Sequence, residues 1–235
     1  MSRGPGVPSP GVKSAASQLL LLLIGIAVLG VLTTTAGADG VKLPSPVVDA
    51  ALATAGTPTR KAVLAGGCFW GIELVYQHVR GVTNAVSGYA GGGAATANYE
   101  AVGTGASGHA EAVEISYDPA RLTYGQLLHI FFSVGHDPTT LDRQGPDYGS
   151  QYRSVIFFTD AEQEKIARAY ISQLDQARAF KSPIVTQVTK LPAFYRAEDY
   201  HQDYATRNPA NPYIVVNDQP KLLNFRTLFP KLYVR

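Results

Sequence analysis

The sequence has a single cysteine and a single tryptophan among 235 residues, Cys68 and Trp70, and only one residue separates them. With one cysteine there is no partner for an internal disulfide, so the thiol is free or pairs with another molecule. Charged residues are also scarce, at 16%, and the formal net charge is +2. No stripe of lysine and arginine is visible, so composition gives no case for a nucleic-acid partner.

The first 38 residues have the pattern of a targeting segment. Two basic residues precede an apolar run at 19–32, and Ala36-Gly37-Ala38 follows in small-x-small form. This pattern predicts a secretory signal peptide that is cleaved after Ala38. The alternative is an uncleaved membrane anchor, because the span 15–38 is long enough to cross a bilayer. We therefore expect an exported protein, periplasmic or otherwise extracytoplasmic. No cysteine stands near the cleavage site, which excludes a lipid anchor on cysteine.

A linker rich in proline, alanine and threonine at 39–60 precedes one domain at 61–235, which is long enough to bury its own core. The periodicity of apolar residues predicts five strands, at 61–67, 82–90, 109–117, 154–158 and 184–190. It also predicts four helices, at 69–79, 118–134, 160–178 and 221–229. Thr159 and Glu162 are expected to form the capping box of the third helix.

The order of these elements is β-α-β followed by β-α-β, with a further helix and strand. It favours an α+β fold, a two-layer sandwich of ferredoxin-like (split βαβ) type with a mixed sheet. Beyond Leu191 the sequence is rich in aromatic residues and without clear periodicity, which predicts an irregular C-terminal segment.

Cys68 lies between a strand that ends in Gly66 and Gly67 and the first turn of the following helix. Unpaired N–H groups and the helix dipole favour negative charge there, so we expect a lowered pKa for the thiol. Free cysteines are also common as small buried apolar residues. The glycines favour a nucleophile, because they allow close approach to the backbone beside the sulfur.

Phe69 and Trp70 belong either to the core face of this helix or to an aromatic box that holds a ligand, such as a methyl group beside a sulfur. Glu111 alternates onto one strand face with Val113 and Ile115. On such an apolar face a carboxyl group has a raised pKa and stays protonated, as a general acid must be. The alternative is a charge at a strand end that pairs with an arginine.

Other motifs carry weaker signals. GTGASG at 103–108 matches a nucleotide-binding pattern, but an alternating strand follows where that motif needs a helix. His136 and Asp137 lack a second histidine at ligand spacing, so the metal signal is weak. The polar stretch 135–154 fits better as a loop that supplies hydrogen-bond donors to a pocket. His201 is equally compatible with a packed or a capping role.

Five stretches together resemble the type A peptide methionine sulfoxide reductases, and they occur in that family's order. They are GGCFWGIE, GYAGG, NYEAVGTGASGHAEAVEISYDP, HDPTTLDRQGPDYGSQYRS and AEDYHQDY. The resemblance runs from about Lys61 to His201 and beyond. It implies an enzyme that reduces methionine-S-sulfoxide, free or in oxidised proteins, and that needs no metal or organic cofactor.

The resemblance also implies a catalytic set. Cys68 corresponds to the nucleophile that attacks the sulfoxide sulfur and becomes a sulfenic acid. Glu111 corresponds to the acid that protonates the sulfoxide oxygen. Tyr99 and Tyr152 correspond to hydroxyl donors to that oxygen, and Asp147 to a carboxylate that orients substrate or water.

The pocket and the reductant follow from the same resemblance. Phe69 and Trp70 correspond to the wall around the substrate's methyl group, with Gly67 beside it. Many family members resolve the sulfenic acid with a C-terminal cysteine, which this sequence lacks. We therefore expect a monomer that is regenerated by an external thiol, which is thioredoxin-like, glutaredoxin-like or of low molecular weight.

Two rival functions differ in their requirements. A cysteine hydrolase needs a histidine base, for which His109, His136 and His201 are available. A methionine-binding module without catalysis would not need the thiol.

Overall fold

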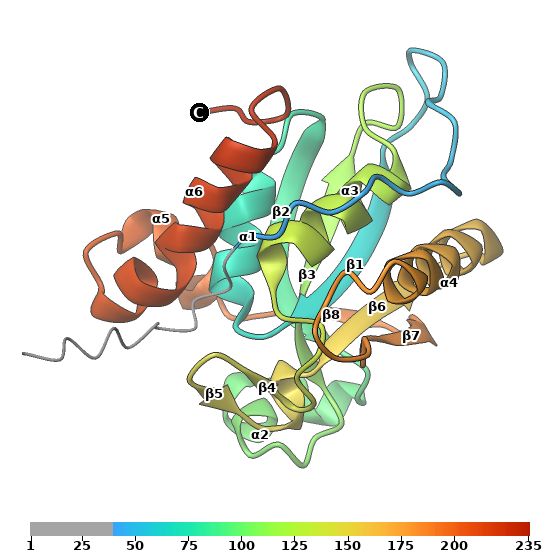
Figure 1. Ribbon diagram of the computed structural model, residues 1–235. Coiled ribbons are helices and arrows are strands. Elements are labelled where there is room, and N and C mark those ends of the chain that lie inside the picture. The colour runs from blue at the N-terminus through green and yellow to red at the C-terminus, as the bar shows by residue number, and fades with distance from the viewer. Residues whose placement is uncertain (1–39) are drawn as a thin grey trace, which may run out of the picture. The chain divides into compact units, whose positions relative to one another are not determined.

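The computed structural model describes residues 40–235, and the predicted signal peptide or anchor at 1–38 lies outside the described residues. Within the described part, a sheet has the strand order β7-β6-β1-β3-β2-β8 (Figure 1). The strands of this sheet are β1 (Arg60–Gly66), β2 (Val82–Ala90), β3 (Ala110–Tyr117), β6 (Ser154–Phe158), β7 (Gln187–Lys190) and β8 (Phe194–Arg196). Strands β4 (Arg143–Gln144) and β5 (Asp147–Tyr148) form a separate hairpin.

The sheet is mixed, as the sequence predicts. Strands β6 and β7 run parallel, and every other neighbouring pair is antiparallel. Strands β1 and β2 are consequently parallel to each other with β3 between them. The helix that joins them, α1, packs on β2 and β3.

Six α-helices lie in the described part of the chain, and none of them is long and apolar enough to cross a membrane. They are α1 (Phe69–Gln77), α2 (Tyr99–Gly103), α3 (Tyr124–Ile130), α4 (Ala161–Gln176), α5 (Tyr204–Arg207) and α6 (Gln219–Leu228). Two π-helical segments join the helices, η2 (Phe131–Gly135) after α3 and η5 (Ile214–Asp218) before α6. Short 3₁₀ turns are η1 (Ala94–Thr96), η3 (Ser150–Tyr152) and η4 (Asp199–His201). The α+β class is confirmed.

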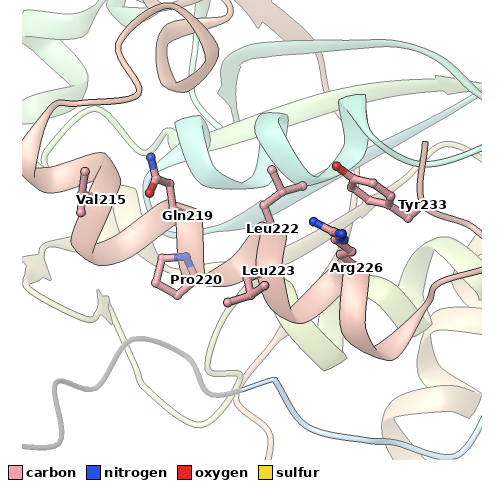
Figure 2. Close-up of a pocket in the computed structure, with 7 residues that line it drawn as sticks. All are labelled: Val215, Gln219, Pro220, Leu222, Leu223, Arg226 and Tyr233. Atoms are coloured by element: carbon pink, nitrogen blue, oxygen red, sulfur yellow. The ribbon is translucent and has the colours of Figure 1, made fainter. Parts of the chain in front are cut away.

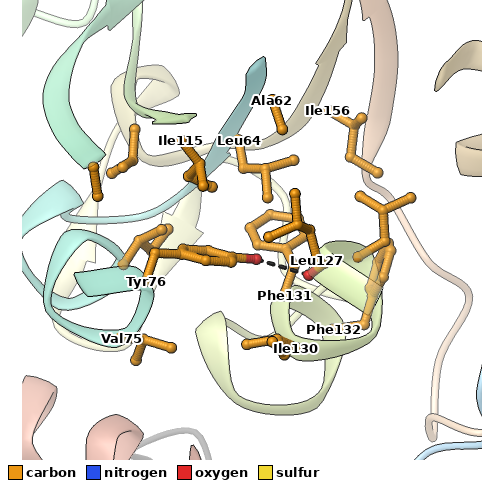
Figure 3. Packing of buried hydrophobic residues seen from close by; sticks show 14 of the residues in the cluster. Ala62, Leu64, Val75, Tyr76, Ile115, Leu127, Ile130, Phe131, Phe132 and Ile156 are labelled. Atoms are coloured by element: carbon orange, nitrogen blue, oxygen red, sulfur yellow. Dashed lines mark hydrogen bonds between the residues drawn. The ribbon is translucent and has the colours of Figure 1, made fainter. Parts of the chain in front are cut away.

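The main core lies between one face of the sheet and helices α1, α3 and α4 (Figures 1 and 3). Leu64, Ile115 and Ile156 from three adjacent strands meet side chains of α1 and α3 there. The buried hydroxyl of Tyr76 donates a hydrogen bond of 2.8 Å to the carbonyl oxygen of Leu127, which ties α1 to α3. Alternate residues of the same strands form a smaller apolar cluster on the opposite face, so the central strands are buried on both sides.

Most predicted elements are found, with shifted ends. The strands at 82–90 and 154–158 have the predicted bounds. The capping box at Thr159 and Glu162 is wrong by one residue, because the side chain of Asp160 accepts the hydrogen bond from the Gln163 N–H. The segment beyond Leu191 is less irregular than predicted, since β8 forms an edge of the sheet and α5 follows it.

Residues 40–59, in the predicted linker, contain no helix or strand but lie on the domain. Leu43 is buried, and the Val41 N–H donates to the carbonyl oxygen of Ser133 at 2.8 Å. Asp49 accepts hydrogen bonds from the hydroxyl of Thr123 at 2.5 Å and from the Gly125 N–H at 2.7 Å. This segment therefore fixes the start of α3.

The cap of α4 can be tested by substitution. We expect Asp160→Ala to lower the free energy of unfolding by about 1 kcal/mol, because one N–H of the first turn loses its acceptor. Thr159→Ala is the matched control, since Thr159 contributes only its backbone N–H, which bonds to Gln163. Urea unfolding of both variants measures the difference, and an equal loss in the two would contradict the assignment.

Candidate active site

Cys68 lies in the turn between the end of β1 and the start of α1. Gly67 has φ +95°, and a Cβ atom there would lie 2.5 Å from the Cβ of Gln144. Both the positive φ and the lack of room for a side chain beside Gln144 therefore require glycine at this position. The chain turns at this point, and Cys68 becomes the N-cap residue of α1 with only 7% of its surface exposed.

Glu111 reaches this turn from the central strand β3. It is 3% exposed, and its Oε2 accepts a hydrogen bond of 3.1 Å from the N–H of Phe69. Phe69 follows Cys68 directly, so the carboxyl group and the thiol are brought to the same turn. Burial raises the pKa of Glu111 to about 8, and the charges of Asp147 and Asp218 act in the same direction. The prediction of a raised pKa is confirmed.

The alternative for Glu111, an ion pair with arginine, is wrong. In residues 40–235 the ion pairs of arginine side chains go to other carboxylates. The hydrogen bond given to Glu111 comes from the backbone of Phe69. At neutral pH this carboxyl group therefore carries its proton and is a candidate acid.

The expected lowering of the pKa of Cys68 is wrong. Burial raises the pKa of this thiol, and Glu111 and Asp218 raise it further when they are ionised. A hydrogen bond from the backbone of Trp70 and the charge of Lys221 act in the opposite direction but do not outweigh burial. The helix start does favour the thiolate, as expected, yet removal from water is the larger effect here.

The other predicted polar residues surround the same point from three separate elements. Tyr99 begins α2, Tyr152 lies in η3 and Asp147 lies in β5. Burial raises the pKa of Tyr99 and of Tyr152, and each is raised further by the charges of Glu111 and Cys68. Asp147 accepts a hydrogen bond of 2.5 Å from the hydroxyl of Tyr213, and burial raises its pKa.

Phe69 and Trp70 take part in an aromatic cluster rather than in the core alone. The ring of Trp70 stacks on Tyr204 with centroids 3.9 Å apart, and the ring of Tyr213 meets it edge-on at 5.9 Å. Phe69 is fully buried, and its ring lies 5.1 Å from that of His201. These rings form an apolar wall beside Cys68, which suits a small apolar group next to sulfur.

The C-terminal side of this site is formed by residues that the sequence did not predict, apart from His201. His201 proves to be packed, because it is 2% exposed and accepts from the Trp70 indole N–H at 3.3 Å. Tyr204 and Tyr213 were missed, although the density of tyrosines around AEDYHQDY is a usable signal. Asp218 and Lys221 were missed as well, and their sequence context gives no signal for them.

No group of three or more His, Cys, Asp or Glu side chains in residues 40–235 is arranged to hold a metal ion. His136 instead is buried, with Nε2 2.7 Å from the hydroxyl of Ser154. A surface pocket on α6 (Figure 2) is lined by Val215, Gln219, Pro220, Leu222, Leu223, Arg226 and Tyr233. None of the predicted site residues lines this pocket, so it is separate from Cys68.

Comparisons with known proteins agree on one family. Residues 60–232 match the family model described as "Peptide methionine sulfoxide reductase". The chain is 56% identical over 185 residues to "Peptide methionine sulfoxide reductase MsrA 2" of Synechocystis, an alignment that covers 78% of this chain and 86% of the relative. It is 58% identical over 172 residues to the protein of the same name from Mesorhizobium japonicum, covering 73% and 88%.

Two solved structures are similar as well. Mxr1 from Saccharomyces cerevisiae in reduced form matches with a TM-score of 0.60 at 30% identity, over 70% of this chain and 94% of that one. Methionine sulfoxide reductase A of Corynebacterium diphtheriae matches with a TM-score of 0.57 at 32% identity, over 74% and 90%.

The turn at Gly67 can be tested directly. We expect Gly67→Ala to cost about 1–3 kcal/mol of unfolding free energy, because a side chain there has an unfavourable φ and collides with Gln144. We also expect the variant to lose most of its enzymatic activity, because the turn that holds Cys68 is displaced. Gly93→Ala is the matched control, since nothing lies within 4 Å of a Cβ at Gly93. Unfolding curves and activity measure both effects, and a fully active Gly67→Ala enzyme would show that the turn does not position the thiol.

Proposed function

The chain belongs to the peptide methionine sulfoxide reductase family and is a peptide-methionine (S)-S-oxide reductase, and on this premise we propose that Cys68 is its nucleophile and Glu111 its acid. The observation that carries the proposal is the hydrogen bond of 3.1 Å between the Glu111 carboxyl and the N–H of Phe69. It brings an acid with a pKa of about 8 to the turn that holds the chain's one thiol.

The proposed reaction conserves atoms and protons. The sulfur of Cys68 attacks the sulfoxide sulfur as Glu111 gives its proton to the sulfoxide oxygen. The S–O bond of the substrate then breaks, and the oxygen passes to Cys68 as a sulfenic acid while methionine leaves. The proton that the thiol lost returns to Glu111. The sulfoxide sulfur is reduced by two electrons, which gives methionine, and the cysteine sulfur is oxidised by two.

The remaining side chains bind and orient the sulfoxide in this proposal. Tyr99 and Tyr152 donate hydroxyl hydrogen bonds to the oxygen, where negative charge would otherwise develop. Phe69 and Trp70 enclose the methyl group, and Asp147 orients substrate or water through its neighbours. Tyr99 is 42% exposed, so this side of the site is open to a methionine side chain on a protein as well as to the free amino acid.

Regeneration is proposed to need a thiol from another molecule. Cys68 is the single cysteine of the sequence, so it has no thiol partner within these 235 residues. An external thiol condenses with the sulfenic acid to give a mixed disulfide and water, and a second thiol releases Cys68. Dithiol proteins of the thioredoxin type suit these two successive thiol reactions, since both thiols then come from one donor.

Two further proposals concern the fold type and the location. The strand order β6-β1-β3-β2, with antiparallel neighbours and helices on one face, supports the ferredoxin-like (split βαβ) type. The composition of residues 1–38 supports export, either by a cleaved signal peptide or on an uncleaved anchor. Fractionation of the producing cells tests the location.

The stoichiometry without reductant tests the one-thiol cycle. We expect one methionine to be released per enzyme when sulfoxide is added alone, because no second thiol reduces the sulfenic acid. Mass spectrometry should show Cys68 heavier by one oxygen atom, and Cys68→Ser should release no methionine. Release of a second methionine before any thiol is added would rule the cycle out.

The acid role predicts a pH dependence. Glu111 donates a proton only while protonated, so kcat should fall as the pH rises through about 8. Glu111→Gln should lower kcat by about 10²–10⁴-fold and remove this descent, because an amide cannot donate the proton. Glu114→Gln is the control on the same strand, since Glu114 pairs with Lys61 away from the thiol. An unchanged pH profile in Glu111→Gln would assign the acid to another group.

A further inference from the structure

A buried ion pair that the proposed cycle leaves without a role lies against the helix turn that Cys68 caps. Asp218 ends η5 immediately before α6, and Lys221 lies in the first turn of α6. The Nζ of Lys221 is 3.3 Å from Oδ1 of Asp218. Asp218 is fully buried and Lys221 is 9% exposed. Both charges have thus been removed from water.

The pair lies against the first turn of α1. A Cβ atom added to Gly71 would overlap Oδ1 of Asp218 and would lie 2.9 Å from Nζ of Lys221. Gly71 is three residues after Cys68, in the turn that Cys68 caps. Glycine at this position lets the two charged groups approach the helix start, where a larger side chain would exclude them.

Several titratable groups face Cys68 from the elements packed around it. They are Glu111 of β3, Tyr99 of α2, Tyr152 of η3, Tyr213 beside η5 and the Asp218–Lys221 pair. Behind them, Asp147 of β5 is bonded to Tyr213, and His201 of η4 packs on Phe69. Two of the groups that act on Cys68, Glu111 and Asp218, are carboxyl groups, which oppose a thiolate whenever they are ionised. Lys221 is the positive charge that acts on both Cys68 and Asp147, favouring the ionised form of each.

The pair is a poor choice for stability alone. Two charges lose their hydration on burial, and an apolar pair of similar volume often serves a fold equally well. The second oxygen of Asp218, Oδ2, is buried and has no hydrogen-bond partner among the described residues. Packing therefore leaves the presence of these charges unexplained.

We propose that Lys221, held by Asp218 against the first turn of α1, is a positioning residue that supplies the positive charge which offsets the thiolate of Cys68 when the thiol loses its proton. The inference rests on the proposed role of Cys68 as nucleophile. Asp218 retains the ammonium group inside the protein and limits the net charge of the site. The two residues therefore act on the thiolate with opposite signs.

The rate of alkylation of Cys68 by iodoacetamide, measured against pH, tests the inference. Because the chain has one cysteine, the label reports this thiol alone. We expect Lys221→Met to move the profile to higher pH and to lower the rate at neutral pH about tenfold, as loss of a nearby opposite charge does. Asp218→Asn keeps an acceptor for the lysine but removes a negative charge, so its profile should move to lower pH.

Controls separate this electrostatic effect from damage to the fold. Lys231→Met removes an exposed lysine beyond α6 and should leave the profile of the wild type. Lys221→Arg keeps the charge and should restore the rate that Lys221→Met loses. Urea unfolding shows that each variant is folded at the pH values used. Opposite shifts in Lys221→Met and Asp218→Asn support the inference, because a structural role would slow or expose the thiol without this sign change.

Two results would overturn it. In one, the profiles of Lys221→Met and Asp218→Asn coincide with that of the wild type. In the other, both profiles move in the same direction. The outcome is separate from the proposed function, because Cys68→Ser tests the nucleophile itself. Loss of turnover in Cys68→Ser with unshifted profiles would leave the catalytic cycle in place and remove only the role of Lys221.

Discussion

The hydrogen bond from the N–H of Phe69 to the carboxyl of Glu111 is the interaction on which the site depends. The first N–H groups of a helix have no acceptor within the helix, and burial makes an unpaired one costly. Glu111 supplies that acceptor from the central strand β3, so the start of α1 is fixed to the sheet. The same bond sets the carboxyl group beside Cys68. One contact therefore both satisfies the N–H of Phe69 and places an acid beside the thiol. It depends on Gly67, which lets the chain turn tightly between β1 and α1.

The central part of the fold is predictable from sequence because its strands are short, apolar and bounded by turn residues. The strands at 82–90 and 154–158 were found with their predicted bounds for this reason. Strand β8 was not predicted, because its three residues carry no periodicity and it forms only by pairing with β2. The cap of α4 was misplaced by one residue, since both Thr159 and Asp160 suit the role and only the backbone conformation decides between them.

The residues of the site likewise divide into those that the sequence predicts and those that it does not. Glu111 stands out locally, as a carboxyl group on an apolar strand, and its raised pKa follows from that pattern alone. The thiol was predicted from its neighbours in the chain, and the prediction that its pKa is lowered failed for a tertiary reason. The helix start acts on Cys68 as expected, but residues 150 and more positions away along the chain help to enclose it. Asp218 and Lys221 belong to this group, and nothing in their own stretch of sequence shows where they will lie.

The chemistry places opposite demands on one buried space. Removal from water keeps the proton on Glu111, which the sulfoxide oxygen needs, and it also keeps the proton on Cys68, which the attacking sulfur must lose. Lower burial would free the thiolate but would also release the proton of the acid, so exposure cannot satisfy both groups. A local positive charge can favour the thiolate without releasing the proton of the acid, if it lies closer to the sulfur than to the carboxyl group. Lys221 meets this condition, because its charge lowers the pKa of Cys68 and of Asp147 and is not among the main causes that set the pKa of Glu111. A buried cation on the α6 side of the site is therefore one way in which an acid and a nucleophile with raised pKa values can work at the same turn.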